Sequence, residues 1–402
     1  MKRPLAIVVS LLFVLTPTYL LRAEQVVIRE IMYHPQLGSN LPEFIEIENL
    51  TTTVIDIAKW RVTGGVSYEF PDFDPAASRN AFLSSRQRLV ICASDPETFR
   101  AAYGLPTSVR VLGPWVGQLD NGGERVTVKD KNGVTVCTVR YNDKHPWPSA
   151  PDGAGHSLVL HNHNRTIDDY RLWKPSANPG GSPGSAEPIT TPSTLRINEV
   201  HFDGLGNIDW VEIYNGGASI DSSGMFLSSR RNFSDKTPLG NPVPSRGFAS
   251  WDVTFDGAGN EWVLYLIDGT DKVLNAVTFR RASGRTHAAA YPDGSSDFFS
   301  SGSGSRDEPN NPSRETEIVI NEMMVEMPSG HRDGEFVELY NKGNSPVDLS
   351  AWRFVSAIDY RFAAGTMLDA GEYLVIAANK LFTSEAQPTA LVGGESAGTL
   401  HN

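Results

Sequence analysis

The feature that most constrains the fold is a stretch of about twenty residues that the chain contains twice. Residues 43–62 read EFIEIENLTTTVIDIAKWRV, and residues 335–354 read EFVELYNKGNSPVDLSAWRF. Both copies keep Glu, Phe, Glu, Asn, Asp, Trp and Arg at the same positions. A looser copy, DWVEIYNGGASIDSSGMF, occupies residues 209–226 and retains the second Glu, the Asn and the Asp. The repetition predicts one folding unit that the chain uses three times.

The pattern within each copy is that of a β-strand. Val337 and Leu339 lie on one face of the expected strand, and Phe336, Glu338 and Tyr340 on the other. Short segments of this kind alternate with clusters of Gly, Pro, Asn, Asp and Ser along almost the whole chain, which is typical of an all-β protein.

Further segments recur around the repeated stretch. A strand that contains Glu precedes each copy, and a Leu-Val-Ile strand follows two of them. Two hairpins with Asp/Gly/Asn-rich turns are also expected, and residues 96–103 (PETFRAAY) are the best candidate for a short helix. The strands before the copies are 27–33, 196–202 and 319–325, the Leu-Val-Ile strands 88–94 and 373–379, and the hairpins 123–141 and 260–279.

These repeats divide the chain into three expected domains, at residues 25–187, 194–312 and 317–402. The unequal spacing of the copies argues against a solenoid, which keeps a fixed short period. Residues 175–193 and 300–315 are rich in Pro, Gly and Ser, so we interpret them as linkers or extended surface segments.

The third domain is expected to be incomplete. Its last residues, GTLHN (398–402), correspond to GQLDN (117–121), which precedes the hairpin of the first domain. A sandwich without that hairpin would expose unpaired strand edges. The sequence therefore favours an N-terminal piece of a longer protein. The alternative is a short form whose third domain is unfolded or is completed by a partner strand.

The N-terminal residues 1–23 have the layout of a secretory signal peptide, with a basic start, an apolar run and a small residue before a polar pair. An uncleaved membrane anchor is the alternative, although the apolar run is shorter than the ~20 residues that a span needs. We expect a mature chain without a membrane span that is secreted, at the cell surface or periplasmic. Cys92 and Cys137 are either bridged or buried as free thiols.

The net charge argues against nucleic acid as a partner. The chain has 35 Lys and Arg against 47 Asp and Glu, which gives a formal net charge of −12. Nucleic-acid binding depends on basic residues that neutralise phosphates, so a nucleic-acid partner is not expected.

The repeated unit resembles the lamin tail domain. The motifs that carry the resemblance are GEFVELYNKGNSPVDLSAWRF and YLVIAAN in the third unit and PEFIEIENLTTTVIDIAKWRV and QLDNGGERVTVKD in the first, whereas the second unit diverges most. The resemblance implies tandem immunoglobulin-like β-sandwiches without catalytic activity. It also implies a role in interactions, as in bacterial surface proteins that carry such modules beside kinase-like domains or hydrolases.

The repeated glutamates Glu46, Glu212 and Glu338 are candidate Ca²⁺ ligands, because Ca²⁺ prefers several carboxylate oxygens. The favoured interpretation is an outward carboxylate that pairs with Arg or Lys on a neighbouring strand. His161 and His163 lie on one face if their stretch is a strand, which would suit zinc or copper, but a polar loop is favoured.

Three tryptophans in Pro/Gly-rich loops, Trp115, Trp147 and Trp173, are candidates for an exposed binding surface. The favoured alternative is that they close the ends of the sandwich. Trp60 and Trp352 follow the Asp turn at equal offsets and are expected in the core.

No nucleophile, metal-protease, phosphate-loop or dinucleotide motif occurs in the chain. The sequence therefore favours a non-catalytic, exported structural, adhesion or interaction protein with a protein, cell-envelope or polysaccharide partner. The alternatives are the accessory N-terminal region of a secreted enzyme, with a spore-coat-protein-H-like kinase or a hydrolase domain downstream, and a carbohydrate-binding module.

Overall fold

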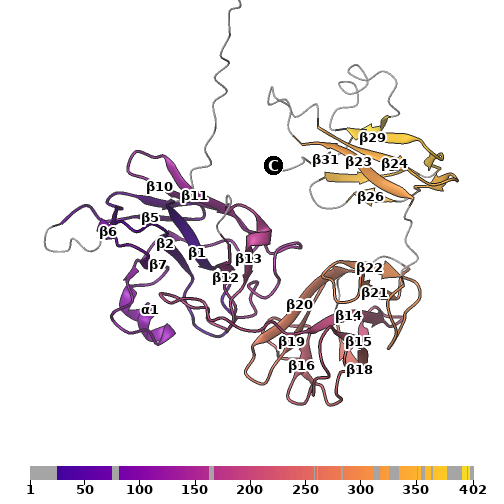
Figure 1. Cartoon of the computed structure of the whole chain (residues 1–402), viewed down its shortest axis with the longest axis horizontal. Helices are drawn as coiled ribbons and strands as arrows, with labels where there is room; N and C mark the ends of the chain where they lie inside the picture. Colours follow the sequence, from indigo (N-terminus) through magenta and orange to yellow (C-terminus); the bar gives the residue numbers. More distant parts are fainter. Residues whose placement is uncertain are drawn as a thin grey trace, which may run out of the picture. The chain divides into compact units, whose positions relative to one another are not determined.

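The computed structural model describes residues 25–74, 81–162, 167–257, 259, 261–281, 284–311, 317–325, 335–350, 352–354, 358–363, 365–377, 392–395 and 397–398. Three β-sandwiches follow one another along the chain, here called the first, second and third sandwich (Figure 1). The first two belong to one compact unit, residues 1–312, and the third to another, residues 313–402. Strands dominate the described residues, which confirms the prediction of an all-β protein.

The first sandwich consists mainly of a six-stranded sheet, in the order β13-β12-β1-β2-β7-β8, and a five-stranded sheet, in the order β11-β10-β4-β5-β9. The first sheet contains β1 (Val26–Met32), β2 (Phe44–Asn49), β7 (Arg88–Cys92), β8 (Val111–Leu112), β12 (Leu158–Leu160) and β13 (Trp173–Pro175). The second contains β4 (Arg61–Thr63), β5 (Val66–Glu69), β9 (Val116–Gly117), β10 (Arg125–Lys129) and β11 (Thr135–Arg140). A short pair, β3 (Ile55–Asp56) and β6 (Phe82–Leu83), forms a separate small sheet, and a 3₁₀ helix, η2 (Tyr170–Leu172), precedes β13.

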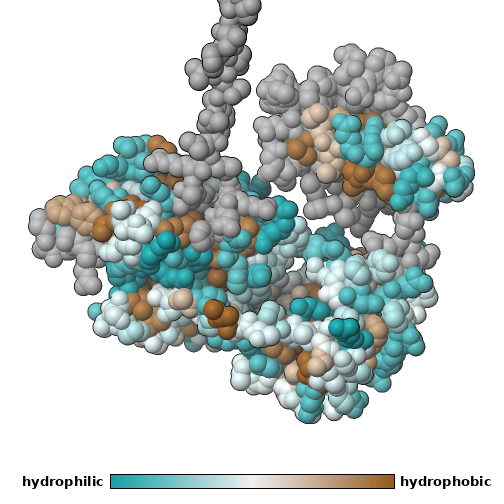
Figure 2. Space-filling view, in the orientation of Figure 1, coloured by the Kyte–Doolittle hydropathy of each residue, from teal (hydrophilic) through white to brown (hydrophobic). Residues whose placement is uncertain are grey.

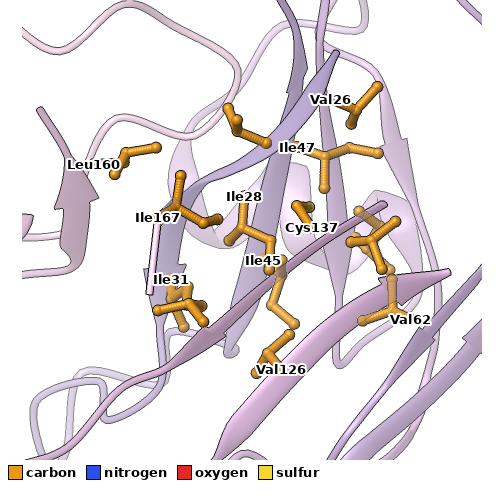
Figure 3. Close-up of a cluster of buried hydrophobic side chains, with 14 of the residues drawn as sticks. Val26, Ile28, Ile31, Ile45, Ile47, Val62, Val126, Cys137, Leu160 and Ile167 are labelled. Carbon is orange, nitrogen blue, oxygen red and sulfur yellow. The ribbon is translucent and has the colours of Figure 1, made fainter. Parts of the chain in front are cut away.

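The core of the first sandwich lies between its two large sheets. Figure 3 shows Ile28, Ile45 and Ile47 of the first sheet among Val62 and Val126 of the second, and all five side chains are completely buried. Burial of each such side chain contributes about 1.5–3 kcal/mol relative to exposure. Strands β10 and β11 supply this core with alternating residues, so in them the hydrophobic pattern of the sequence determines which face points inward.

A helix covers the other face of the six-stranded sheet. Helix α1 (Pro96–Tyr103) begins after Asp95, whose carboxylate accepts hydrogen bonds from the first free amides, and ends at Gly104 with φ of 62°. Phe99 of the helix packs with Phe44 and Cys92 in a small second cluster. The predicted helix at residues 96–103 is therefore confirmed.

The two cysteines are both buried and free. Cys92 belongs to the cluster beneath helix α1, whereas Cys137 belongs to the core between the two sheets. Of the two alternatives that the sequence left open, the structure therefore shows the buried free thiols.

The second sandwich repeats the arrangement with a five-stranded sheet, in the order β18-β15-β14-β21-β22, and a four-stranded sheet, in the order β17-β16-β19-β20. The strands of the first sheet are β14 (Leu195–Phe202), β15 (Ile208–Asn215), β18 (Phe248–Phe255), β21 (His287–Ala290) and β22 (Phe298–Ser301). Those of the second are β16 (Phe226–Ser228), β17 (Thr237–Pro238), β19 (Glu261–Ile267) and β20 (Val273–Arg280). This sandwich has its own hydrophobic core, separate from that of the first.

The predicted hairpins are confirmed in both sandwiches. Strands β10 and β11 pair in the first sandwich, and β19 and β20 in the second. The carboxylates of Asp130 and Asp268 accept hydrogen bonds from backbone amides two and four residues later, which holds each turn in place.

The third sandwich contains a four-stranded, a three-stranded and a two-stranded sheet among the described residues. Its four-stranded sheet contains β23 (Ile318–Met324), β24 (Phe336–Asn341), β29 (Tyr373–Ala377) and β30 (Val392–Glu395) in that order. The remaining strands are β25 (Val347–Asp348), β26 (Arg353–Phe354), β27 (Ile358–Arg361), β28 (Met367–Leu368) and β31 (Ala397–Gly398). Trp60 is buried in the first core, as predicted, but Trp352 is 37% exposed, so its prediction as a core residue is wrong.

The repeated asparagine explains why the chain reuses one stretch of sequence. The amide of Asn49 donates to the carbonyls of Thr53, Leu83 and Ser84, and its oxygen accepts from the amide of Thr51. Asn215 and Asn341 make the equivalent hydrogen bonds in the other two sandwiches. One buried side chain thus fixes both the turn after the strand and a second loop beside it.

Direct contacts join the first and second sandwiches. Asp152 of the first forms an ion pair with Arg231 of the second, and the backbone amide of Val273 donates to Nε2 of His156 over 3.0 Å. A small apolar cluster accompanies these contacts and contains Ala154, Phe233, Tyr265 and Ile267. The two sandwiches therefore share an interface as well as a connecting segment.

In the part of the chain that the structure describes, no helix is both long and apolar enough to cross a membrane.

Candidate functional site

Two glutamates face each other across the first pair of strands in every sandwich. Each pair follows an irregularity in the register, where one residue bulges out of the first strand. The opposed residues are Glu30 and Glu46, Glu199 and Glu212, and Glu322 and Glu338. The repeated carboxylates of the sequence are thus brought together in pairs by strand register.

The first pair is completely buried beneath a loop that we call strap 1, residues 181–184. The backbone amide of Ser182 donates to Oε1 of Glu30 over 2.8 Å, and the Ser182 hydroxyl donates to Oε2 over 3.1 Å. The amide of Gly184 donates to Glu46 over 2.5 Å, and Arg88 on the neighbouring strand β7 donates to Glu46 over 3.1 Å. Strap 1 therefore covers this part of the sheet, and its peptide N–H groups donate hydrogen bonds to the buried carboxylates.

The second pair has the same cover, strap 2, residues 304–307. The amide and hydroxyl of Ser305 both donate to Oε2 of Glu199 over 3.1 Å, and the amide of Asp307 donates to Glu212 over 2.5 Å. Asn198, the bulged residue, donates to Glu212 over 2.9 Å. Both straps lie in segments that the sequence predicts to be linkers or extended surface segments. Strap 2 is mostly exposed, as a surface segment would be, but the buried carboxylates bind both straps to the sheet, so neither strap is a free linker.

Burial shifts the titration of these carboxyls. It raises the pKa of Glu30 to about 7 and the pKa of Glu46 to about 8, and the hydrogen bonds from Ser157 and Ser182 limit the rise at Glu30. Burial likewise raises the pKa of Glu212 to about 8 and raises that of Glu199. Removal of a carboxylate from water disfavours its charged form, so these residues hold protons more strongly than exposed glutamates.

The predicted outward orientation is wrong for Glu46 and Glu212, since both are fully buried. The predicted partner on a neighbouring strand is present for Glu46, which pairs with Arg88, whereas Glu212 binds an amide side chain and a peptide N–H instead. Glu338 is half-buried and accepts from Asn321. In the described residues, no three His, Cys, Asp or Glu side chains are grouped to hold a metal ion, Ca²⁺ included.

No described histidine of this region belongs to a group that could hold a metal ion. His161 is exposed, and His163 lies outside the described residues. His156 is buried, and its ring contacts the carbonyl of Ser176 and the amide of Val273, so it fills a structural position. Burial lowers the pKa of His156, which keeps its ring neutral.

Of the three loop tryptophans, two do not form an exposed surface. Trp115 and Trp173 are only 5% and 3% exposed, so for them the surface prediction is wrong and the alternative, closure of the sandwich, holds. The indole N–H of Trp173 donates to the carbonyl of Ile167 over 2.8 Å. Trp147 is half-buried, with its ring centre 6.4 Å from that of Trp173.

A cavity of about 1090 Å³ lies beside Trp147, between the first and second sandwiches. We call it the junction groove. Elements of both sandwiches line it, together with the Pro-rich residues 186–192 that connect them. Its lining includes six Arg and Lys residues but only one acidic residue, Glu187; the six are Arg29, Arg88, Arg171, Lys174, Arg196 and Lys272.

Three of these cations are already neutralised in part. Arg29 and Arg88 both pair with Glu48, and Arg171 pairs with Asp169. Glu187, the acidic residue of the groove, accepts hydrogen bonds from strap 1 and from the amide of Ala177.

The other three cations form no ion pair with any described residue. Lys174 is exposed, and Lys272 and Arg196 are half-buried. Lys174 in particular therefore offers unpaired positive charge in a chain whose net charge is −12, whereas Lys272 interacts electrostatically with the Asp268 carboxylate.

Sequence reasoning missed the cations of the groove. Lys174, Arg196 and Lys272 are separated by many residues and belong to no basic run. Only the packing of β13, β14 and β20 around the connecting segment brings them to one cavity. The loop tryptophans were the one available signal, since Trp147 and Trp173 both line it.

Comparison with known proteins agrees with this architecture. The family model for the lamin tail domain matches residues 22–143 and 311–400, slightly more than half of the chain. A search of curated proteins finds no match. The second sandwich lies between the matched regions, yet it has the same glutamate pair, bulge and asparagine as its neighbours. The chain belongs to the lamin tail domain family.

Proposed function

We propose that the chain is a non-catalytic, exported interaction protein that binds an acidic polysaccharide in the junction groove. The observation that carries the proposal is the charge of the groove. Its lining has six Arg and Lys residues against one carboxylate, although acidic residues outnumber basic ones in the chain as a whole. A local field of this sign attracts anions despite the negative net charge.

The unpaired cations set the chemistry of the ligand. Lys174, Arg196 and Lys272 form no ion pair with a described residue, although Arg196 donates to the carbonyls of Ser193 and Leu195 and Lys272 interacts electrostatically with Asp268. A carboxylate or sulfate on a ligand would give these cations a direct anionic partner. One ion pair with an exposed cation contributes little binding free energy. A polymer that contacts several cations at once binds more tightly, because each further contact forms at a high effective concentration. A chain of acidic sugars fits this requirement better than a small anion.

Aromatic side chains beside the cations support a sugar ligand. Trp147 is half-buried and Tyr170 is 41% exposed, and both line the groove. Aromatic faces provide apolar area for the C–H face of a sugar ring, while their polar edges stay in water. The groove thus combines stacking surface with positive charge.

The amino-acid sequence supports the proposed location. Residues 1–23 have the layout of a secretory signal peptide, and a polysaccharide ligand is in keeping with an exported chain. Tandem sandwiches without a repeated catalytic motif suit a protein that binds and spaces its partners. Sequencing the N-terminus of the exported protein tests the location separately from the ligand.

The direct test is binding of labelled oligogalacturonate to the chain from residue 24, measured by fluorescence anisotropy at low and high salt. We expect saturable binding that weakens as salt screens the groove. The double variant Lys174→Glu with Lys272→Glu should weaken binding at least ~10-fold. Lys131→Glu serves as the matched control, because Lys131 is exposed in the β10–β11 turn and does not line the groove.

Competitors decide between ligand classes. Fully methyl-esterified oligogalacturonate, which lacks the charges, should compete poorly. If single-stranded DNA of equal charge displaces the sugar more tightly, the ligand class is wrong. Equal loss of binding in the groove and control variants would show that net charge alone matters and would overturn the proposal.

A further inference from the structure

The interface between the first and second sandwiches depends on polar contacts. Its apolar cluster receives only Ala154 from the first sandwich, and the other buried members, Phe233, Tyr265 and Ile267, belong to the second. On the face in view, Figure 2 shows mostly hydrophilic and neutral residues on these two sandwiches. Domains that share a small or polar interface move relative to each other more readily than domains joined by a large apolar one. The polar contacts therefore determine whether the two sandwiches stay together.

Three described histidines of the first sandwich take part in these polar contacts. His156 and His145 contact the second sandwich directly, and His34 binds Asp152, the carboxylate that pairs with Arg231. Histidine is the side chain whose charge ordinarily changes between about pH 5 and 8. A moderate change in pH therefore acts on this interface.

His156 makes the contact that depends most strictly on protonation. Its side chain is buried, Nδ1 lies 2.7 Å from the carbonyl of Ser176, and Nε2 lies 3.0 Å from the amide of Val273 in β20. A carbonyl only accepts and a peptide N–H only donates, so Nδ1 must carry the proton and Nε2 must be free. These partners require a neutral ring. A second proton on Nε2 would point at the Val273 N–H and turn the contact between the sandwiches from attraction into repulsion.

The surroundings of His156 also favour the neutral ring. Burial has the largest effect and lowers the pKa of His156 below its ordinary 6.5; Lys272 acts in the same direction, and the Ser176 carbonyl, Glu187 and Asp268 act against it. Because the closed interface holds the neutral ring, the contribution of His156 is full above pH 6.5 and is lost as pH falls through the lowered pKa.

The other two histidines have opposite effects. A protonated His34 would compete with Arg231 for Asp152 and would place a like charge beside that arginine, which weakens the interface. A protonated His145 would strengthen its pair with Asp297, but both partners are exposed and such pairs contribute little. The buried histidine contact therefore sets the direction of the response.

We propose that the interface between the first and second sandwiches is an acid-sensitive hinge, closed while the ring of His156 is neutral and opened when Nε2 gains a proton. Lys272 and Val273 line the junction groove, so opening would also change the shape of the groove. An effect on a bound polysaccharide rests on the function proposed above, whereas the hinge itself requires no ligand.

The test measures the distance between two spin labels by double electron–electron resonance, in the chain from residue 24 and without ligand. The labels are attached to Lys131→Cys in the first sandwich and Thr254→Cys in the second, two exposed positions. Cys92 and Cys137 are buried and therefore react poorly. We expect one distance at about pH 8 and an additional, longer distance at about pH 5. Circular dichroism over the same range reports whether the sandwiches stay folded.

Two variants identify the histidine that responds. His156→Gln keeps a neutral acceptor for the Val273 amide and does not titrate, so it should stay closed at about pH 5. His145→Gln is the matched control at an exposed histidine of the same interface, and it should still open. Hydrogen exchange at the Val273 amide, relative to its intrinsic rate, should be at least ~10-fold faster in acid in the unaltered chain and unchanged in His156→Gln.

Three results would overturn the hinge. The first is an identical distance at both pH values, and the second is a His156→Gln variant that opens as the unaltered chain does. The third is a loss of circular dichroism over the same range, because opening would then follow from unfolding. If His156→Gln is open already at about pH 8, exchange at Val273 in the unaltered chain decides: faster exchange in acid supports the hinge, and constant exchange overturns it.

Discussion

Replacement of Gly181 by alanine is the sharpest test of the strap. Gly181 has φ of 73°, and a Cβ atom there would lie 2.1 Å from Oε1 of Glu30 and 2.7 Å from the hydroxyl of Ser157. Real Cβ atoms essentially never show such distances, so either strap 1 or the Glu30 side chain must move, and both movements separate the strap from the carboxylate. The neighbouring Gly180 has φ of 86°, but its Cβ would meet only Leu41, at 4.0 Å. Gly180→Ala is therefore a matched control.

The magnitude follows from the hydrogen bonds that move with the strap. A non-glycine residue at positive φ costs about 1–2 kcal/mol, and both variants share this cost. Gly181→Ala also loses the amide and hydroxyl bonds from Ser182 to Glu30, each worth about 1.5–3 kcal/mol to a charged acceptor. Because the pKa of Glu30 is about 7, its charge is only partly present at neutral pH, and we take the lower value, about 3 kcal/mol in all.

Hydrogen exchange at the Ser182 amide measures this difference directly, and urea unfolding followed by tryptophan fluorescence supports it. A loss of about 3 kcal/mol corresponds to an exchange rate about 100-fold faster in Gly181→Ala than in Gly180→Ala. If the two variants exchange at the same rate, the buried carboxylate does not hold the strap and the reasoning fails.

Three further predictions concern the fold. Asn215→Ala should destabilise the second sandwich by about 3 kcal/mol in urea unfolding, since several buried backbone groups lose their partner; unchanged stability would contradict the role of the asparagine. The pKa of Glu30 and of Glu46 is higher in the folded chain than the ordinary 4.5, so their contribution to the free energy of unfolding is full below pH 4.5 and is lost as pH rises through about 7 to 8. Glu46→Gln should therefore weaken the dependence of the free energy of unfolding on pH in this range. An unaltered pH dependence would argue against the burial effect. Arg231→Ala removes the ion pair between the sandwiches and leaves Asp152 with His34 alone, so it should increase the distance between probes on the first and second sandwiches; an unchanged distance would show that other contacts suffice.

The local structure of the sandwiches was predictable from sequence because it depends on neighbours along the chain. Alternation placed the strands, and Asp- and Gly-rich turns placed the hairpins at residues 123–141 and 260–279. Asp95 and Gly104 limit the helix at residues 96–103. Such signals depend on residues only a few positions apart, so they can be recognised without knowledge of the fold.

The glutamate pairs show where sequence reasoning stops. A strand with one apolar face predicts that the other face meets water, so Glu46 and Glu212 were expected to point outward. The actual cover comes from residues 181–184 and 304–307, which lie almost one hundred residues or more away in segments whose composition predicts linkers or surface segments. Only folding reveals that a Gly-Ser segment can bury a carboxylate by supplying its hydrogen bonds.

The sequence by itself determined the repeated unit, its strands and its family, since these depend on periodicity and on motifs of adjacent residues. Tertiary structure alone decided which carboxylates and which tryptophans are buried. It also decided that Lys174, Arg196 and Lys272 line the same groove. The physical reason is that burial and local electric field are properties of all the segments that surround a side chain. Those segments come from distant parts of the chain, and no local pattern records them.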